Sequence, residues 1–260
     1  MGGFFGAVSA NDCILDVFYG TDYHSHLGTR RGGMTSYSAE LGFQRNIHSI
    51  ENSPFRTKFE KDVEKMRGNI CIGCISDTDP QPIMVRSKLG LYAVCSIGII
   101  QNAKALSEEL LENGCANFET MSSGNINSGG LIGALIAQKP TFVEGIRYAQ
   151  SKIEGTMSLV IMTEDSIICA RDKAGKLPIL IGKRSDGYCF SFESFAYQKL
   201  GYETCHELKA GEITKLTKDG YEVLYEGTDE MKICTFLWTY YGYPTACYEG
   251  VNVEVMRTKN

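Results

Sequence analysis

The order of strand-like and helix-like segments constrains the fold of this 260-residue chain more than any other feature. β-branched and aromatic residues dominate a first group of segments, as they do in strands, at residues 3–8, 70–76, 83–86 and 91–100. Strand-like segments return later, at residues 158–163, 166–171, 178–182, 188–191 and 211–216. Turn signals such as Asp-Gly separate several of them.

Helical segments lie between the two strand groups. Residues 103–113 carry leucines at helical spacing and end before a glycine, and residues 131–138 and 141–151 form a further pair divided by Pro140. One more helix is expected at 12–19. Strands, then paired helices, then strands predict two packed sheets with helices outside them, an α+β sandwich.

Charge and hydropathy exclude two classes of protein. The formal net charge of −5 leaves no basic stripe to neutralise phosphates, so a nucleic-acid binder is not expected. The longest apolar stretch, residues 89–100, is broken by Gly90, Ser96 and Gly98 and is too short to span a bilayer. No targeting segment is evident at the start of the sequence, so we expect a cytoplasmic protein and no membrane partner.

The ten cysteines are scattered and mostly lie in apolar runs, which favours buried, reduced thiols. Cys71 and Cys74 have a ligand-like spacing, but no second pair follows, and on a strand they would point to opposite faces. We therefore expect no metal and no cofactor. The cysteines are Cys13, Cys71, Cys74, Cys95, Cys115, Cys169, Cys189, Cys205, Cys234 and Cys247.

Several stretches, taken in chain order, match motifs of one known family. Gly3-Phe4-Phe5-Gly6-Ala7 resembles an opening C-G-I-x-G strand, and Arg30-Arg31-Gly32-Gly33 stands in the place of H-R-G-Q. Residues 79–82 resemble N-x-Q-P, and residues 155–159 resemble G-x-x-S-L. The most specific block, residues 170–194, matches A-R-D-x-x-G-x-x-P-L-x-x-G with a trailing S-E-S, and residues 208–213 resemble the P-G-E-I strand.

These motifs resemble the class II glutamine amidotransferases, most nearly the glutaminase half of amidophosphoribosyltransferases. The resemblance implies a four-layer αββα sandwich of the N-terminal nucleophile hydrolase type over residues 1–230. Such enzymes hydrolyse glutamine and pass ammonia to a second site. Residues 231–260 resemble the connector to a phosphoribosyltransferase domain, whose signature is absent from the sequence. We therefore expect that this chain alone cannot make phosphoribosylamine.

The residues that would perform the chemistry are replaced. The family's N-terminal cysteine, whose thiolate attacks the amide, corresponds to Gly2. The arginine that binds the substrate carboxylate, in G-H-x-R-Y-S-T, corresponds to Ser76, and the Asn-Gly oxyanion pair of H-N-G-N-L corresponds to Ser96 and Ile97. The acid of S-D-T-E, which holds the substrate ammonium, corresponds to Gly124. We expect a pseudo-glutaminase with no catalytic residue.

Other polar residues have two interpretations. Arg30 and Arg31 border the implied glutamine pocket and either hold an anion or shape a turn. The His24-Ser25-His26 run suggests a metal site, but a role at a helix end or on the surface is favoured because no carboxylate cluster accompanies it. The acidic pair at 77 and 79 suggests a metal ligand set or an Asx-type turn before Pro80.

Two functions remain open. The first is a non-catalytic subunit or regulatory module of a larger amidotransferase or glutamate-synthase-like assembly, in purine or glutamate metabolism. Its aromatic run 236–243 would either pack on the domain or, as we favour, dock another subunit or a second copy. The second is an amide hydrolase or amino-acid sensor with a rebuilt pocket. It would recruit Arg30, Arg31, Ser76 or Ser96, with the Gly2 amine as base.

Overall fold

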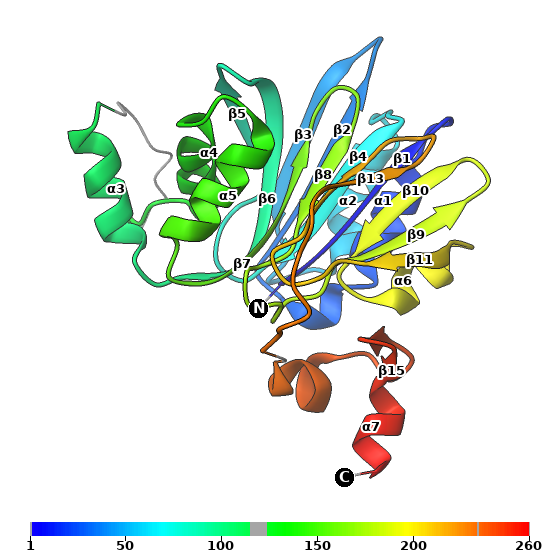
Figure 1. The fold of residues 1–260 in the computed structure, drawn as a ribbon. Coiled ribbons are helices and arrows are strands. Elements are labelled where there is room, and N and C mark those ends of the chain that lie inside the picture. Colours follow the sequence, from blue (N-terminus) through cyan, green and yellow to red (C-terminus); the bar gives the residue numbers. More distant parts are fainter. Residues whose placement is uncertain (1, 115–123, 233, 260) are drawn as a thin grey trace.

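Two β-sheets pack face to face, with helices on both outer faces (Figure 1). The computed structural model describes residues 2–114, 124–232 and 234–259. The arrangement is the α+β sandwich expected from the order of the segments, and it has the four αββα layers that the family resemblance implied. Among the described residues, no helix is both long enough and apolar enough to span a bilayer.

The first sheet has seven strands in the order β11-β9-β10-β1-β4-β2-β3, and neighbouring strands are antiparallel. Its strands are β1 (Gly2–Ser9), β2 (Arg31–Ser38), β3 (Gly42–Ser49), β4 (Ile70–Ser76), β9 (Leu180–Arg184), β10 (Gly187–Ser191) and β11 (Glu203–Glu207). β1 and β4 are buried along their whole length, because helices cover one face and the second sheet covers the other.

The second sheet has six strands in the order β13-β12-β8-β7-β6-β5, again antiparallel. Its strands are β5 (Ile83–Ser87), β6 (Gly90–Ile100), β7 (Gly155–Met162), β8 (Ile167–Ala170), β12 (Ile213–Leu216) and β13 (Tyr221–Tyr225). Apolar residues of β6 and β7, such as Cys95 and Val160, join the core of the first sheet, while their alternate neighbours face the helices.

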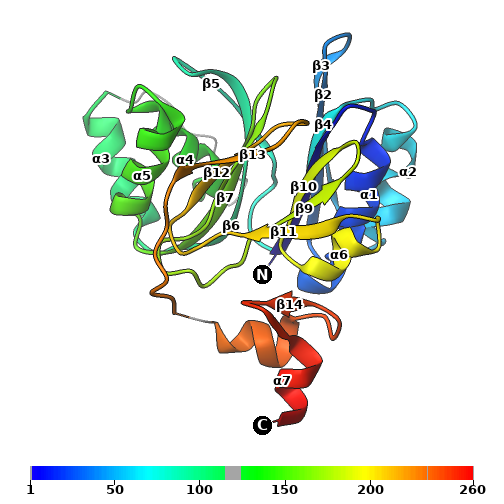
Figure 2. The same cartoon turned by 45° about the vertical axis from the view of Figure 1, so that its right-hand side comes forward.

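Each sheet has its own helical layer (Figure 2). The first carries α1 (Ile14–Asp22), α2 (Phe55–Val63) and α6 (Ser194–Gln198), with the short helix η1 (Ser25–Leu27) after α1. The second carries α3 (Ala103–Glu112), α4 (Ser128–Ala137) and α5 (Phe142–Lys152). Local sequence fixes two of the helix starts. The side chain of Asn127 accepts hydrogen bonds from the first turn of α4, and Thr141 does the same for α5.

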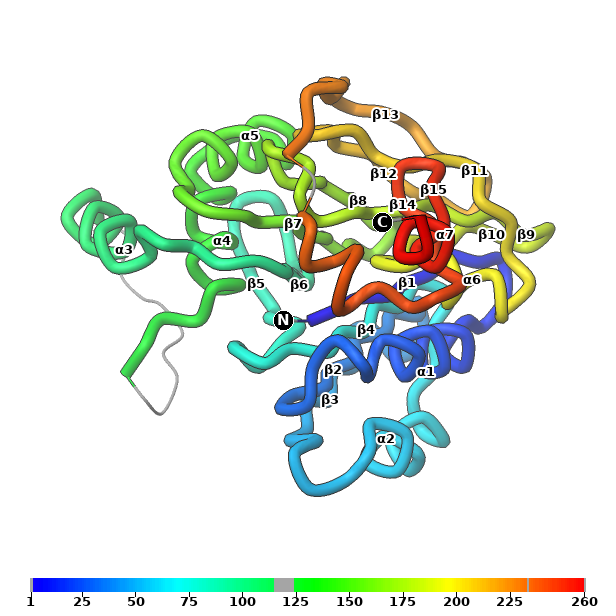
Figure 3. Tube along the Cα trace, turned by 90° about the horizontal axis from the view of Figure 1, so that it is seen from below, coloured from blue at the N-terminus to red at the C-terminus, as the bar shows by residue number. Residues whose placement is uncertain are grey.

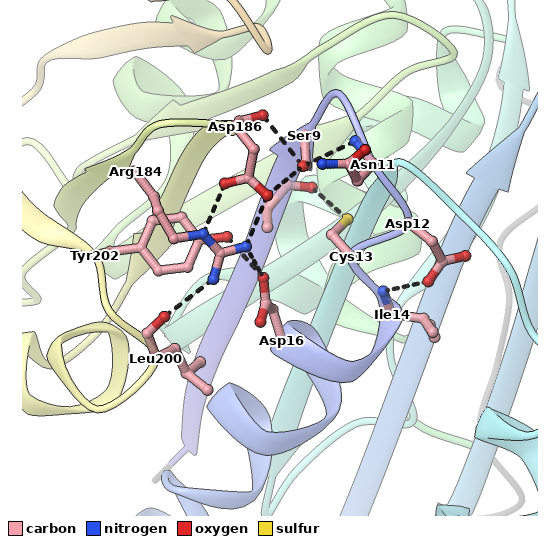
Figure 4. A network of polar contacts seen from close by, with 11 residues as sticks. Ser9, Asn11, Asp12, Cys13, Ile14, Asp16, Arg184, Asp186, Leu200 and Tyr202 are labelled. Atoms are coloured by element: carbon pink, nitrogen blue, oxygen red, sulfur yellow. Dashed lines mark hydrogen bonds and ion pairs between the residues drawn. The ribbon is translucent and has the colours of Figure 1, made fainter.

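A polar network ties α1 to the β9–β10 hairpin (Figure 4). The Arg184 guanidinium donates to Asp186 at 2.7 Å and to Asp16 of α1 at 2.6 Å, and it lies over the ring of Tyr202. The hydroxyl of Tyr202 donates to the same carboxylate of Asp16 at 2.9 Å. The hydrogen bond from Arg184 lowers the pKa of Asp186 to about 2. The Asp-Gly turn seen in the sequence therefore also anchors the first helix.

The C-terminal segment lies below the sandwich and beside the N-terminal end of β1 (Figures 1 and 3). It contains the π-helical turn η2 (Leu237–Tyr241), a hairpin of β14 (Cys247–Tyr248) and β15 (Val251–Asn252), and α7 (Val253–Lys259). Trp238 and Tyr248 are buried against the domain, whereas Phe236 is 62% exposed and Tyr240 is 79% exposed. The aromatic run thus packs on the domain with one part and faces solvent with the other.

Candidate functional site

Three of the predicted site positions come together in one row across the first sheet. Gly2 of β1 lies opposite Ser76 of β4, and Ser76 lies opposite Arg31 of β2. Arg31 in turn lies opposite Ser49 of β3. Directly opposed residues on neighbouring strands share a face of the sheet. The implied nucleophile position, the implied carboxylate-binding position and one arginine are therefore adjacent.

Gly2 has no room for a side chain in this backbone. A Cβ built on it would lie 2.5 Å from the carbonyl oxygen of Ile75, whereas real Cβ contacts are essentially never below 3.0 Å. The obstacle is main chain of a neighbouring strand, which cannot swing away as a flexible side chain would. At the N-terminal end of β1, this backbone therefore accommodates glycine but no larger residue at position 2.

The hydroxyl of Ser76 is used by the turn that follows it. Its hydroxyl accepts hydrogen bonds from the backbone N–H groups of Thr78 at 3.2 Å and Asp79 at 3.1 Å. The nearby acids also have backbone partners, since Asp77 accepts from Thr29 at 2.7 Å and Asp79 accepts from Ser128 at 3.2 Å. Partial burial would raise the pKa of Asp77, but the hydrogen bonds to its carboxylate hold it below its ordinary value. The two carboxylates thus connect the turn to the segment before β2 and to the start of α4, whereas the turn's own N–H groups are bound by the Ser76 hydroxyl.

Ser96 and Ile97 lie on β6 of the second sheet. The amide of Gln81 accepts from the Ser96 N–H at 2.6 Å and donates to the Ser96 carbonyl at 3.1 Å, as a strand partner would. Ile97 is 6% exposed and belongs to the core. The next residue, Gly98, has a φ of +141°, and a Cβ there would lie 2.0 Å from the Thr156 carbonyl oxygen. The position on this stretch that requires glycine is therefore Gly98.

The remaining predicted positions are separate from the row. Arg30 directly precedes β2 and is exposed. Gly124 has a φ of +79° with open space around its Cβ position, and the residues before it, 115–123, lie outside the described part of the chain. Cys115 falls in that same stretch.

The sequence did not reveal the buried carboxylate of Glu193. It accepts from the Tyr248 hydroxyl at 2.5 Å and from the Tyr243 N–H at 2.8 Å, and it lies 2.8 Å from His26 Nε2. Burial would raise the pKa of Glu193, but the hydrogen bonds from His26 and Tyr248 hold it below its ordinary value. Glu193 is the acid of the S-E-S motif, and its role is to hold the C-terminal segment.

His24 is buried, although a surface or helix-end role was favoured for this run. It directly precedes η1, with Nδ1 2.7 Å from the Gly20 carbonyl and Nε2 3.2 Å from the Ser191 hydroxyl. Burial lowers its pKa to about 4, so the imidazole is neutral at pH 7. Of the two roles favoured, the helix-end role is confirmed for His24, which lies between α1 and η1. The surface role was wrong for this residue, because the sequence could not show that β10 would cover it.

Four of the cysteines contact one another across packed layers as free thiols. Cys71 lies against Cys13 and Cys74 lies against Cys95, on opposite faces of β4 as expected. Burial raises the pKa of the Cys71 and Cys95 thiols well above the ordinary value, which disfavours thiolate chemistry. Within the described residues, no group of three or more His, Cys, Asp and Glu is placed to hold a metal ion. A groove of about 770 Å³ between α1 and α2 contains none of the predicted residues.

Known proteins support the interpretation of the motifs. Residues 66–198, about half of the chain, match the family described as the glutamine amidotransferase domain. The amidophosphoribosyltransferase of Archaeoglobus fulgidus is 25% identical over 94% of this chain and 54% of its own length. That of Drosophila melanogaster is 26% identical over 98% of this chain and 53% of its own length. The chain thus spans about half the length of these relatives.

The fold matches as well. The solved glutamine phosphoribosylpyrophosphate amidotransferase of Bacillus subtilis superimposes with a TM-score of 0.86 at 23% identity, covering 98% of this chain and 56% of that one. A class II glutamine aminotransferase domain protein of Silicibacter pomeroyi superimposes with a TM-score of 0.58 at 12% identity, covering 87% of this chain and 99% of that one. The sandwich is therefore of the N-terminal nucleophile hydrolase type. Together, the family match and the fold show that this chain belongs to the class II glutamine amidotransferase domain family.

Proposed function

We propose that this chain is a catalytically silent glutaminase domain, related to amidophosphoribosyltransferases, that serves as a subunit or regulatory module. The observation that carries the proposal is Gly2. It stands where the family has its nucleophilic cysteine, and the Ile75 carbonyl oxygen lies 2.5 Å from the position that its Cβ would take. Without a thiol at this place there is no covalent route to the amide carbon.

Two further positions support the proposal. Ser76, in place of the carboxylate-binding arginine, has its hydroxyl committed to the following turn. On β6 the glycine-requiring residue is Gly98, so we align the glycine of H-N-G-N-L with Gly98 and its asparagine with Ile97. The oxyanion-binding amide is then replaced by a buried aliphatic side chain. Loss of one such donor typically costs about 2.7–4 kcal/mol of transition-state stabilisation.

The C-terminal segment supports a role in an assembly. Phe236 and Tyr240 lie with ring centroids 5.9 Å apart and ring planes tilted by 30°, and both remain largely exposed. Aromatic residues are enriched at protein interfaces. The relatives carry roughly as much chain again as the part matched here. We propose that this face binds another subunit or a second copy of the chain in a cytoplasmic assembly of purine or glutamate metabolism. Replacing both aromatic residues by serine would then shift the chain to a smaller species in light scattering.

Ammonia release from glutamine tests the central claim. The purified chain is compared with an active class II glutaminase at matched concentration, by enzyme-coupled detection of ammonia. We expect release at the rate of the protein-free blank. Turnover above the blank, abolished by heat denaturation, would show that another nucleophile operates and would overturn the proposal.

A further inference from the structure

The groove between α1 and α2 lies on the outer face of the first sheet, where the two helices run side by side (Figure 2). Its volume of about 770 Å³ is within the range of protein binding sites. The floor is apolar and consists of the nearly buried side chains of Ile14, Phe18 and Val63. Leu15 of α1 also lines the groove and is 56% exposed. The described part of the chain therefore leaves an apolar surface open here.

Two acidic side chains beside this apolar surface have no partner. Glu60 of α2 and Glu64 at its C-terminal cap line the groove one helical turn apart, and both are exposed. Among the described residues, neither carboxylate makes an ion pair or a hydrogen bond. The Arg56 guanidinium is already bound, because it donates to Asp22 at 3.1 Å, and Arg67 donates to main-chain carbonyl groups. The groove therefore carries unpaired negative charge.

The position of Glu64 adds to this imbalance. The C-terminal end of a helix has a partial negative charge, so an acidic residue there is disfavoured and a cation is favoured. A basic group placed against Glu64 would relieve both charges at once.

The walls of the groove favour a helix as the occupant. Both walls are helices, whose main-chain N–H and C=O groups are bonded internally, so an extended peptide finds no sheet edge to pair with. A third helix can instead pack its side-chain ridges into the groove between the other two. Its residues at positions i, i+3, i+4 and i+7 would reach the apolar floor.

We propose that the groove between α1 and α2 binds an amphipathic, basic helix of a partner polypeptide. The apolar face of that helix contacts Leu15 and the floor, and two basic side chains one turn apart meet Glu60 and Glu64. A second copy of this chain fits less well, because a twofold axis through the groove would place these carboxylates opposite each other. The groove is separate from the exposed Phe236 and Tyr240 of the C-terminal segment, so the inference goes beyond the proposed function.

Binding is tested on the full chain by fluorescence anisotropy with two labelled helical peptides of about four turns each. One peptide has a leucine face and a lysine face, and the other has glutamate at every lysine position. We expect saturable binding of the lysine peptide, about tenfold tighter than that of the glutamate peptide or more. The difference should shrink as the salt concentration rises, because the charges of the groove are exposed.

A charge reversal tests the role of the two acids. In Glu60→Lys/Glu64→Lys, the preference between the peptides should reverse, because the groove then carries positive charge. The matched control is Glu108→Lys/Glu112→Lys, an exposed acidic pair at the same spacing on α3. This control should change the affinity for either peptide less than twofold.

A polar replacement tests the apolar contact. Leu15→Gln should weaken binding of the lysine peptide about tenfold, because an exposed leucine that the partner would bury is lost. Leu111→Gln is the matched control, since Leu111 is 49% exposed on α3 and does not line the groove. It should leave the affinity within twofold of the native value.

Several outcomes would overturn the assignment. They are no saturable binding of the lysine peptide, equal affinity for both peptides, an unreversed preference in Glu60→Lys/Glu64→Lys, or an equal loss in a control variant. A dimer in light scattering that Leu15→Gln dissociates would also overturn it, because the groove would then belong to an interface between copies. Thermal unfolding verifies that each variant is folded, which the exposure of the replaced side chains leads us to expect. Ammonia release and the replacement of Phe236 and Tyr240 test the proposed function separately.

Discussion

Restoring the missing thiol should not restore the enzyme. In a Gly2→Cys variant, the new Cβ must move from 2.5 Å to at least 3.0 Å from the Ile75 carbonyl oxygen, so β1 and β4 must separate locally by about 0.5 Å. The two strands are paired without interruption from Gly2 opposite Ser76 to Val8 opposite Ile70. The variant therefore either strains the pairing of β1 with β4 or breaks its first residue pair, Gly2 with Ser76. In both cases the thiol moves away from the position beside Ser76.

The expected loss of stability follows from the overlap between the new Cβ and the Ile75 carbonyl oxygen. Insertion of atoms into a packed site typically costs about 1–3 kcal/mol. Because Gly2 is the first residue of β1, fraying relieves part of the strain, and we expect about 1–2 kcal/mol of lost unfolding free energy. For a chain of this size each kcal/mol lowers the melting temperature by about 2–4 °C. The matched control is Gly220→Cys, because a Cβ at Gly220 meets nothing within 4 Å.

Both variants are measured by scanning calorimetry and by ammonia release from glutamine, with Met1 present and after its removal by methionine aminopeptidase. We expect Gly2→Cys to melt below Gly220→Cys and to release no ammonia in either form. A Gly2→Cys protein that is as stable as the control and hydrolyses glutamine would refute the reasoning. A single substitution at Gly2 would then be enough to give glutaminase activity.

Three further measurements test other parts of the structure. Glu193→Gln should weaken docking of the C-terminal segment and speed its removal in limited proteolysis severalfold, whereas the exposed Glu203→Gln should not. Gly98→Ala should cost more than Gly42→Ala, by 1 kcal/mol or more in urea unfolding, since both have positive φ but only Gly98 also faces a carbonyl oxygen. His24 is neutral in the fold, with a pKa of about 4 against 6.5 in the unfolded chain, so its contribution to stability is complete above pH 6.5 and is lost as the pH falls toward 4. The difference in unfolding free energy between native and His24→Gln protein should therefore shrink by about 2 kcal/mol from pH 7 to pH 5, and an unchanged difference would contradict the buried, neutral assignment.

Sequence pattern predicted the strands and helices whose apolar residues follow a clear period, and it failed where the period is weak. β2, which reads Arg-Gly-Gly-Met-Thr-Ser-Tyr-Ser, has glycines and polar residues where a strand signal needs large apolar ones, so neither it nor β3 was expected. α2 was also missed, although Phe55, Phe59 and Val63 recur every four residues and offered a usable signal. Segments with strong local preference can thus be found from sequence, whereas β2 is a strand because its neighbours pair with it.

The same limit applies to the candidate site. The motifs named Gly2, Ser76 and the two arginines, but which arginine joins the row depends on the register between β2 and β4, and a shift of one residue would exchange their faces. The S-E-S motif identified Glu193, but its role could not be predicted, because its partners Tyr243 and Tyr248 come from a segment that packs back on the domain. A sequence shows which residue types are present, but which residues become neighbours across strands depends on how the strands pair in the folded protein.

Several of the residues that carry the family resemblance satisfy buried polar groups. Ser158 of G-x-x-S-L donates to the Leu177 carbonyl and accepts from the N–H of Asp172 in A-R-D, and the Asp172 carboxylate accepts from Leu177 in return. The guanidinium of Arg171 donates to two carbonyl groups and to Glu249 of the C-terminal segment.

Leaving such a buried group without its partner costs about 1–3 kcal/mol, a large part of a typical domain's stability, whether or not the protein catalyses anything. Most of the positions where this chain departs from the family motifs lie instead at Gly2 and Ser76 and on β6, and the residues now present there fit the local backbone and core. A chain can therefore keep most of the motifs that identify this family after its glutaminase site is gone. Activity has to be inferred from the N-terminal end of β1, because overall similarity to the family reports on the fold.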